Sequence, residues 1–427
     1  MEDLNFQRSV PVYGRYDIVV VGGGPSGVCA SIASARKGMR VLLVESTGSL
    51  GGMATSAMVG PFMTNYDKNG EVQTVRGLFS EIVERLVQKG GALPSESIEA
   101  PGVYTSFIGR YHRHVTPFDS FCLEIVLDEM VREAGVSVLC YTQFSDCIVE
   151  DGRIRAVILS ALEGLIAVEA EQFIDCTGIA AVAQSAGVPT YKGDEEKGIP
   201  QPGTLMFEVG GVKDDAYVSR PRRPVKAYKT SIPGRYKVNH YHVYNVDAAD
   251  SESMTEAHCK ARGQVLDAFA VLRDETPGFE AISLLRVASM LGVRESRHIE
   301  GEYQITVKDV SDGVRFDDRI AVYGFGMDVH SRTEEESGNF KVEVAERYYI
   351  PYRSLIPKHC KNLLVAGKTL SCESQAVGGM RCMPAAMAMG QAAGTAASMA
   401  IIDKTEVRDI SIADLQADLR RQNVILD

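Results

Sequence analysis

The 427-residue sequence contains no run of about 18 apolar residues, no repeated segment and no low-complexity tract. The missing apolar run argues against a membrane-spanning helix. Shares of 45% hydrophobic and 24% charged residues are those of an ordinary globular protein, not of a disordered or fibrous one. Positive charge is also in deficit, and a net charge of −11 disfavours non-specific binding to nucleic acid or to an anionic membrane surface.

The nine cysteines form no CxxC pair and are odd in number, which argues against a disulfide framework or a zinc ribbon. They predict free thiols in a reducing compartment. The first residues, MEDLNFQRSVPVYGRYD, lack a basic start followed by an apolar stretch, so a secretory signal is not expected. These absences together predict a cytoplasmic protein.

The length of the chain favours two structural lobes over one. A stretch rich in charge, glycine and proline at 192–203 marks a predicted boundary, because such residues pack poorly. We therefore predict one domain that is built from residues 1–195 and 346–427. A second, β-rich domain of residues 196–345 is inserted between these two segments.

A strand, a glycine turn and a helix follow one another in YDIVVVGGGPSGVCASIASARKGMRVLLVEST, which predicts a βαβ unit. Gly22, Gly24 and Gly27 form GxGxxG between the first strand and the helix. The first glycine turns the chain, the second lets the backbone approach a pyrophosphate, and the third lets helix pack on strand. The helix start, near Pro25 and Ser26, directs N–H groups and a positive dipole at the phosphates.

An acid ends the second strand of this unit. Glu45, followed by Ser46, stands where a carboxylate accepts hydrogen bonds from a ribose diol, and this choice disfavours a ligand with a 2′-phosphate. The pattern therefore predicts a dinucleotide. It leaves NAD and FAD open as alternatives.

The segment GSLGGMATS at 48–56 separates these two cofactors. With IDCTG at 174–178, IPYRSLIP at 350–357 and NLLVAGKTLSCESQAVGGMRCMPAAMAMGQAAGTAA at 362–397, it resembles the FAD-dependent oxidoreductase family, whose Gly-Gly-Met-Ala-Thr stretch runs past the flavin. The resemblance spans nearly the whole chain. It implies an α/β fold in which a Rossmann-like FAD-binding domain carries an inserted β-rich substrate domain. The residues added to the predicted FAD site are Gly51, Gly52, Met53, Ala54, Thr55, Phe144, Thr177, Gly178, Gly367, Arg381, Met383 and Pro384.

The resemblance also implies that Arg381, Met383 and Pro384 approach the pyrimidine edge of the isoalloxazine. A helix start there, together with an arginine, stabilises the negative charge of reduced flavin and raises its reduction potential. The alternative for Arg381 is a surface arginine that flanks the helix. The chain departs from many flavoproteins in carrying Gly367-Lys368 instead of Gly-Asp, so the ribityl hydroxyls need another partner.

The densest polar motif of the inserted domain is SMLGVRESRHIEGEYQIT at 289–306, which also resembles the family. We predict that Arg294 and Arg297 hold a carboxylate or another oxyanion, and that Glu295 fixes one of them by a bidentate pair. The alternative is an ion-pair network that only joins the two lobes. His330, in FGMDVHS, is the predicted general acid or base.

Tyr352 and Arg353, in IPYRS, are predicted to face the isoalloxazine. The whole set predicts an enzyme that transfers a hydride between flavin N5 and a small, anionic or polar organic substrate. The alternative is a flavin-containing electron-transfer or structural subunit without a small-molecule substrate of its own. The expected partners are that substrate and an unidentified electron donor or acceptor, with a second copy of the chain as a further candidate.

Three other groups of residues receive structural interpretations. His240 and His242 alternate as on one face of a strand, which suits a metal but more often marks a polar sheet face, so no metal site is predicted. Cys372 and Cys382 are spaced too widely for the short motifs of disulfide reductases and are interpreted as packing residues. The cluster GRYHRH at 109–114 is interpreted as a solvated loop rather than a cover for an anionic substrate.

Overall fold

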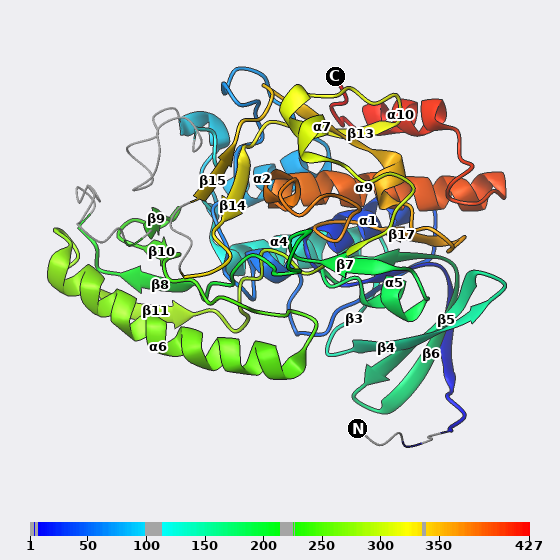
Figure 1. Ribbon diagram of the computed structural model, residues 1–427, viewed down its shortest axis with the longest axis horizontal. Helices are drawn as coiled ribbons and strands as arrows, with labels where there is room; N and C mark the ends of the chain where they lie inside the picture. The colour runs from blue at the N-terminus through cyan, green and yellow to red at the C-terminus, as the bar shows by residue number, and fades with distance from the viewer. Residues whose placement is uncertain (1–3, 5–6, 99–112, 214–224, 226, 335–338) are drawn as a thin grey trace.

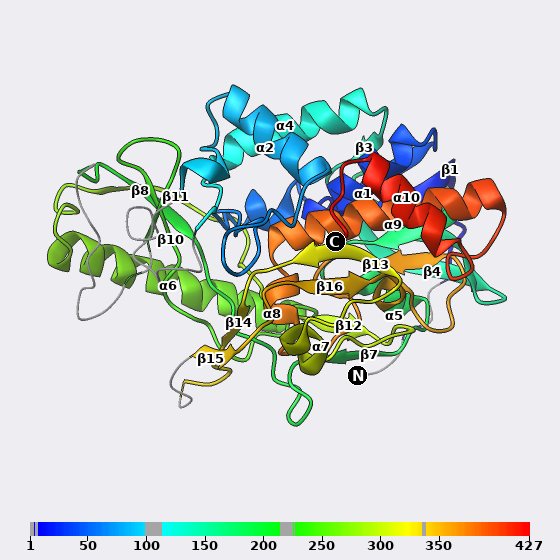
Figure 2. The same ribbon diagram turned by 90° about the horizontal axis from the view of Figure 1, so that it is seen from above.

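A computed structural model describes residues 4, 7–98, 113–213, 225, 227–334 and 339–427. Figures 1 and 2 show two groups of strands side by side along the longest axis of the molecule. A seven-stranded sheet lies with helices α1 and α9, and a four-stranded sheet lies with the long helix α6 at the other end. The predicted α/β class is confirmed by this mixed architecture and its parallel strands.

The seven-stranded sheet has the order β3-β2-β1-β6-β5-β4, and β17 pairs with the end of β6. Its parallel strands are β1 (Val12–Val21), β2 (Val41–Val44), β3 (Ser137–Leu139), β6 (Gly164–Asp175) and β17 (Leu363–Val365). The last residues of β1 and all of β2 and β17 are buried, which explains their continuous apolar sequences. The carboxyl ends of these strands therefore lie at one edge of the sheet.

A hairpin of β4 (Gln143–Glu150) and β5 (Arg153–Ala161) extends this sheet in antiparallel fashion beside β6. Its two central residues, Asp151 and Gly152, have φ of 50° and 74°. Positive φ at both positions is what a type I′ turn requires. A tight two-residue turn therefore joins β4 to β5.

Helix α9 (Met383–Asp403) runs beside α1 (Pro25–Arg36) over the sheet (Figure 1). Small residues allow this close approach, since a Cβ at Gly390 would stand 2.0 Å from the carbonyl oxygen of Ser26. By length and composition α9 is able to cross a membrane, yet 89% of its apolar window is buried inside the structure. Helix α9 is therefore a buried core helix of this half.

Most other helices of this half contact α9 or α1, α5 contacts β4 and β6, and Figure 2 shows α2 and α4 side by side. They are α2 (Leu78–Gln88), α4 (Ser120–Glu133), α5 (Ala181–Ser185), α8 (Val377–Met380) and α10 (Ile412–Arg421), with the 3₁₀ turns η1 (Gly52–Ala54), η2 (Ser95–Ser97) and η3 (Tyr352–Leu355). The side chain of Asp119 caps α4 by accepting a hydrogen bond from Cys122 N.

The four-stranded antiparallel sheet has the order β11-β8-β10-β9. Its strands are β8 (Phe207–Gly210), β9 (Ala227–Lys229), β10 (Tyr236–Val238) and β11 (Ser283–Val287). A separate hydrophobic cluster of residues from 205 to 291, with Met58, joins this sheet to α6 (Ser251–Glu275). This 25-residue helix lies within the predicted β-rich domain, but the sequence analysis did not predict it.

Three further strand pairs form separate two-stranded sheets. They are β7 (Thr190–Lys192) with β12 (Arg297–Ile299), β13 (Arg319–Tyr323) with β16 (Tyr348–Pro351), and β14 (Met327–His330) with β15 (Asn339–Val342). The short helix α7 (Val307–Asp312) lies near β16. The pairing of β13 with β16 crosses position 346, and buried residues of both strands share a core with α9. The predicted domain limits stay a prediction.

Candidate functional site

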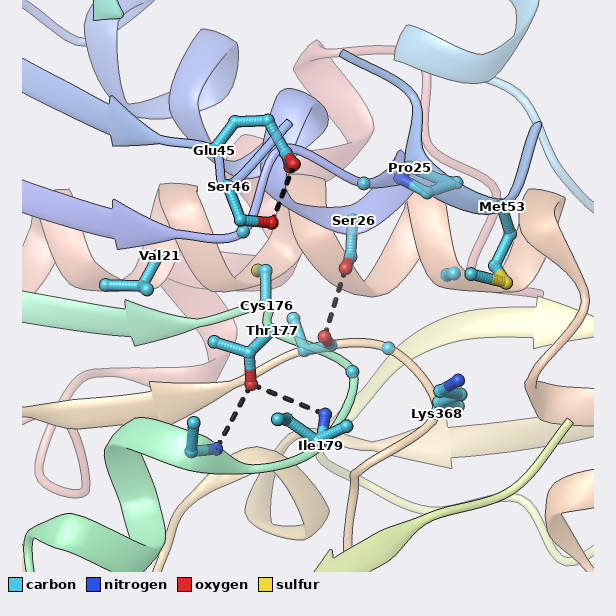
Figure 3. A pocket seen from close by; sticks show the side chains of 18 of the residues that line it. Val21, Pro25, Ser26, Glu45, Ser46, Met53, Cys176, Thr177, Ile179 and Lys368 are labelled. Carbon is cyan, nitrogen blue, oxygen red and sulfur yellow. Dashed lines mark hydrogen bonds between the residues drawn. The ribbon is translucent and has the colours of Figure 1, made fainter. Parts of the chain in front are cut away.

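A cavity lies at the carboxyl ends of β1, β2, β6 and β17, which is where open α/β sheets bind their ligands (Figure 3). Many residues of the predicted FAD site line it: Gly22, Gly24, Pro25, Ser26, Glu45, Ser46, Gly52, Met53, Phe144, Thr177, Gly178, Gly367, Arg381 and Met383. The other predicted cofactor residues lie one or two positions in the sequence from this lining: Gly27, Gly51, Ala54, Thr55 and Pro384. The predicted catalytic residues stand outside it: Arg294, His330, Tyr352 and Arg353.

The glycine turn after β1 has the geometry that its sequence predicts. Gly22 has φ 103°, and a Cβ there would lie 2.4 Å from Cys176 O. A Cβ at Gly27 would lie 1.8 Å from Gly22 O, so only glycine lets the helix approach the strand. At Gly24 a Cβ would meet no described atom within 4 Å. The backbone of Gly24 is therefore accessible to a ligand in the cavity.

Helix α1 begins at the cavity with Gly24 as its N-cap, and no side chain caps its first N–H groups. Ser26 donates a hydrogen bond from its hydroxyl to Ala366 O at 3.1 Å, which ties the helix start to the end of β17 (Figure 3). Uncapped N–H groups at a helix start, with the helix dipole behind them, suit a phosphate.

Glu45 is buried at the cavity wall. Its Oε2 accepts a hydrogen bond from Gly23 N at 2.8 Å, and its Oε1 accepts others from Thr47 N at 2.7 Å and from the Ser46 hydroxyl at 3.2 Å (Figure 3). An ionised carboxylate oxygen has two lone pairs, so Oε2 keeps one for a further donor such as a ribose hydroxyl. The protein contacts hold the carboxylate in place for that role.

The loop after β6 is held by Asp175, which sequence reasoning missed. This buried carboxylate accepts hydrogen bonds from Thr177 N at 3.0 Å, Thr177 Oγ1 at 2.7 Å and Ala183 N at 3.0 Å. Burial raises the pKa of Asp175, against these hydrogen bonds, which lower it. The loop is thereby shaped so that Thr177 and Gly178 face the cavity. An acid at the end of an apolar strand was the available signal.

The Gly-Gly-Met-Ala-Thr segment forms η1 and crosses the glycine turn. Gly51 and Gly52 have φ of 99° and 49°, and a Cβ at Gly52 would stand 3.1 Å from the Cα of Gly24. The Thr55 hydroxyl donates to Leu50 O at 2.7 Å and closes the segment on itself. This close approach brings Met53 to the cavity wall beside Pro25 (Figure 3).

The far wall of the cavity is the start of α9. Its N-cap is Cys382, and no side chain caps the first N–H groups. Arg381 donates from Nη2 to Asp328 O at 2.8 Å and to Asp328 Oδ2 at 3.0 Å, while its Nε is buried without a hydrogen-bond partner among the described residues. An uncapped helix start and a buried orphan donor fit an electron-rich ring edge of the kind that flavin presents.

Lys368 stands where many flavoproteins carry the ribityl acid. Its Nζ donates to Val293 O at 2.9 Å, and its side chain reaches the cavity next to Gly178. Burial, reinforced by repulsion from Arg381, lowers the pKa of Lys368 to about 8. The lysine therefore joins the cavity wall to the segment that leads to Arg294.

Beyond Arg381 the contacts continue to a buried histidine. Asp328 Oδ2, which accepts from Arg381, lies 3.2 Å from His330 Nε2. Desolvation and the nearby Arg294 lower the pKa of His330 to about 4, so the ring is neutral at pH 7. Desolvation raises the pKa of Asp328, but His330, Arg381 and Arg294 together hold it well below its usual range. The two residues form an aspartate–histidine pair.

Arg294 is buried near this pair. Its Nη1 donates to Pro202 O at 2.7 Å and to Thr204 Oγ1 at 2.8 Å, and desolvation and repulsion from Arg381 lower its pKa to about 10. The predicted pairing of Glu295 with Arg294 or Arg297 is wrong. Glu295 instead pairs with Arg332 at 3.0 Å. Side chains of neighbours in an extended segment point to opposite sides, which separates Glu295 from Arg294.

Tyr352 and Arg353 are directed elsewhere. Tyr352 is buried and its hydroxyl donates to Val407 O at 2.7 Å. The Arg353 guanidinium carbon lies 4.8 Å from the centre of the Tyr303 ring, and Arg353 Nε is 3.4 Å from Asp318. These contacts give no support to a catalytic role for either residue.

The remaining candidates have structural contacts. Among the described residues no group of three or more His, Cys, Asp or Glu is arranged to hold a metal ion, and the His242 ring packs edge-on against His330 at 4.7 Å. All nine cysteines are free thiols, and burial raises the pKa of Cys372. Most of the 109–114 cluster lies outside the described residues, but His114 is buried between Ser95 O and Gly70 O and is not part of a solvated loop.

Three comparisons place this geometry among known proteins. The sequence model of the FAD dependent oxidoreductase family matches residues 17–419. Thiamine thiazole synthase from Aeropyrum pernix is 31% identical over 188 residues, 42% of this chain and 60% of that protein. Digeranylgeranylglycerophospholipid reductase from Methanocaldococcus jannaschii is 37% identical over 82 residues, 19% of each chain. Both matches span less than two thirds of the relative. The flavin-dependent brominase Bmp2, as a triple mutant, has a TM-score of 0.50 at 13% identity, covering 95% of this chain and 84% of its own, which shows a shared fold alone.

Proposed function

Because this chain belongs to the FAD-dependent oxidoreductase family, we propose that it is an enzyme whose cavity holds FAD for hydride exchange with a small polar or anionic substrate. The family decides the choice that the glycine motif left open, in favour of FAD over NAD. It also favours an enzyme over a subunit in which flavin is only structural. Bound FAD supplies a two-electron centre that takes up or gives back a hydride at N5.

Different cavity residues would bind different parts of FAD. The glycine turn and the uncapped start of α1 hold the pyrophosphate, and Glu45 holds a ribose hydroxyl. The start of α9 and Arg381 stabilise negative charge on the flavin ring. Each assignment rests on a polar group of the chain that the protein itself leaves unsatisfied or accessible.

The proposed proton transfer to and from the substrate rests on the series of contacts from Arg381 through Asp328 to His330. Nε2 of the neutral His330 ring donates to the Asp328 carboxylate, which fixes the tautomer and leaves a lone pair on Nδ1. That Nδ1 is buried and has no hydrogen-bond partner among the described residues. His330 Nδ1 therefore takes a proton from substrate oxygen or nitrogen during oxidation and returns it during reduction.

Anaerobic flavin reduction tests this proposal. Purified protein that carries FAD is mixed without oxygen with a panel of hydroxy acids, amino acids and polyols, and the visible flavin band is followed. An active member bleaches the band, and His330→Asn slows bleaching about 10²–10⁴-fold at unchanged flavin content. A flavin that no member bleaches favours the structural alternative.

We also propose a cytoplasmic location, a separate electron donor or acceptor, and a second copy of the chain as a candidate partner.

A further inference from the structure

We propose that the substrate carries a carboxylate on the carbon next to the one that reacts, as in a 2-hydroxy acid, a 2-amino acid or their 2-oxo counterpart. This inference rests on the proposed function, because it takes His330 as the proton-transferring group. It adds the chemical class of the substrate and two groups that bind it, Arg294 and Gln201.

The first argument is an excess of buried positive charge. Arg294 is 8% exposed, and no carboxylate of the described residues lies within ion-pair distance of it. The nearby Asp328 is already shared by Arg381 and His330, and Glu295 is paired with Arg332. With His330 neutral, the two arginines and one aspartate leave one uncompensated positive charge. Arg294 has neutral hydrogen-bond acceptors but no anionic partner among the described residues, and a buried charge in that state is strongly unfavourable. A substrate carboxylate is the group that relieves it.

The second argument is an unsatisfied amide beside this charge. Gln201 is 1% exposed, and its Nε2 is buried with no hydrogen-bond partner among the described residues. A buried orphan donor of this kind points to a ligand, because buried polar groups are otherwise satisfied. An amide N–H and a guanidinium together offer the donors that a carboxylate needs.

The backbone places Gln201 between the other two groups. Its N–H donates to Glu295 Oε2 at 2.9 Å, and the next carbonyl, Pro202 O, accepts from Arg294. Its side-chain Oε1 accepts from His330 N at 3.3 Å. Gln201 therefore touches the histidine strand on one side and the arginine segment on the other.

This arrangement limits the distance between the bound acid and the reacting atom. Gln201 contacts His330 directly, and Arg294 bonds to the carbonyl of Pro202, the residue that follows Gln201. We therefore place the acid group and the reacting hydroxyl or amine on neighbouring carbons of the substrate. Oxidation then breaks the C2–H bond, whose hydrogen leaves with its electron pair to FAD. The O–H or N–H proton passes to His330 Nδ1, and a C2=O or C2=N bond forms.

Calorimetric titration of the FAD-loaded protein tests the acid subsite without turnover. The probes are pyruvate, 2-oxobutyrate and glyoxylate, with pyruvamide as the neutral match of pyruvate. We expect at least one 2-oxo acid to bind, pyruvamide to bind far more weakly, and Arg294→Gln to weaken the acid about 30-fold or more. Arg319→Gln is the matched control, because Arg319 is a largely buried arginine that bonds to Leu426 O away from the cavity. It should leave the affinity unchanged.

A second variant keeps Arg294 in place. Gln201→Glu puts a carboxylate where the substrate acid should sit, so it should abolish binding of the 2-oxo acids even if Arg294→Gln fails to fold. The proposal is overturned if no 2-oxo acid binds, if pyruvamide binds as well as pyruvate, or if Gln201→Glu binds the acid normally. The flavin band of the same samples reports FAD separately, so protein that never holds FAD refutes the proposed function and not the acid subsite.

Discussion

Glycine 390 offers a sharp test of how the cofactor site is assembled. It lies inside α9 where this helix crosses α1, and a Cβ on it would stand 2.0 Å from Ser26 O and 2.7 Å from Ser26 C. Real Cβ atoms essentially never come within 3.0 Å of such atoms. The obstruction is backbone and cannot rotate away. Gly390→Ala therefore forces α1 and α9 apart near the start of α1.

Two opposing effects set the magnitude of this change. Alanine in a helix interior is favoured over glycine by about 1 kcal/mol. Overpacking of a tight core costs about 1–3 kcal/mol, and a clash with fixed backbone belongs at the upper end. We expect Gly390→Ala to lower the free energy of unfolding by about 2 kcal/mol. It should also weaken FAD binding, because Ser26 lines the cavity at the helix start that we propose as the pyrophosphate site.

Gly263 supplies the matched control. It lies inside α6, and a Cβ there would meet no described atom within 4 Å. Gly263→Ala should raise the free energy of unfolding by about 0.5–1 kcal/mol and leave FAD content unchanged. Urea unfolding curves and the flavin content of both variants measure these effects. If Gly390→Ala were as stable as Gly263→Ala and retained its FAD, the helix contact would not shape the site as argued.

Three further predictions concern single charges. Glu45→Gln should weaken FAD binding about 10–100-fold, because a charge-assisted hydrogen bond contributes about 1.5–3 kcal/mol. Flavin fluorescence titration measures the affinity. Glu171→Gln, at an exposed position, should leave the affinity unchanged. Because burial and Arg294 lower the pKa of His330 to about 4, kcat/KM for oxidation should fall only below about pH 4 in the native enzyme. In Arg294→Gln the lost repulsion raises the pKa of His330, so the fall of kcat/KM at low pH should begin at a higher pH. If the pH profile of kcat/KM does not shift, His330 is not the base. Burial lowers the pKa of Lys237 from 10.5 to about 8 in the folded protein. Between these two pH values the unfolded chain binds the proton more tightly than the folded one. The free energy of unfolding should therefore rise as the pH rises from about 8 to 10.5. Lys237→Met should remove up to about 1.4 kcal/mol per pH unit of that slope, as read from urea unfolding at several pH values; an equal slope in both proteins contradicts the buried-amine argument.

The cofactor half of the site was predictable because its requirements are local. The conformations of Gly22 and Gly52 and the close packing of Gly27 are demands on single residues that only glycine meets. Glu45 ends a buried strand at a fixed place in the same unit. A short segment therefore contains both the pattern and the reason for it.

The substrate half was only partly predictable because its contacts join distant segments. His330 and Arg294 were selected for their residue types, but Asp328 and Gln201 acquire their roles only when β14, the 201–204 segment and Arg381 meet. The contact of Tyr352 was not predictable for the same reason, since its hydroxyl donates to Val407 O, 55 positions later in the chain. Nothing near it in the sequence announces that partner.

The missed helix α6 had a local signal of another kind. Its buried residues Ala257, Ala261, Val265, Ala268 and Leu272 recur at helical spacing. Three of the five are alanines, whose small apolar surface gives a weak amphipathic pattern among many charges. The pattern therefore gives no clear helix signal, and the prediction of a β-rich domain does not include this helix.

Glu295 decides which variants can separate the two halves of the site. Its buried carboxylate accepts hydrogen bonds from Gln201 N, Arg332 and the Ser374 hydroxyl, so one group anchors the acid subsite and also the loop that leads to Arg381. Replacing it removes the carboxylate that contacts Arg332 at 3.0 Å, and a defect in FAD binding and one in substrate binding would appear together. Gln201 contacts this network through its backbone N–H and the substrate side through its amide. A side-chain change at Gln201 should therefore alter the acid subsite while the hydrogen bond from Gln201 N to Glu295 remains. Gln201 is thus the position at which a variant can change substrate binding without changing FAD binding.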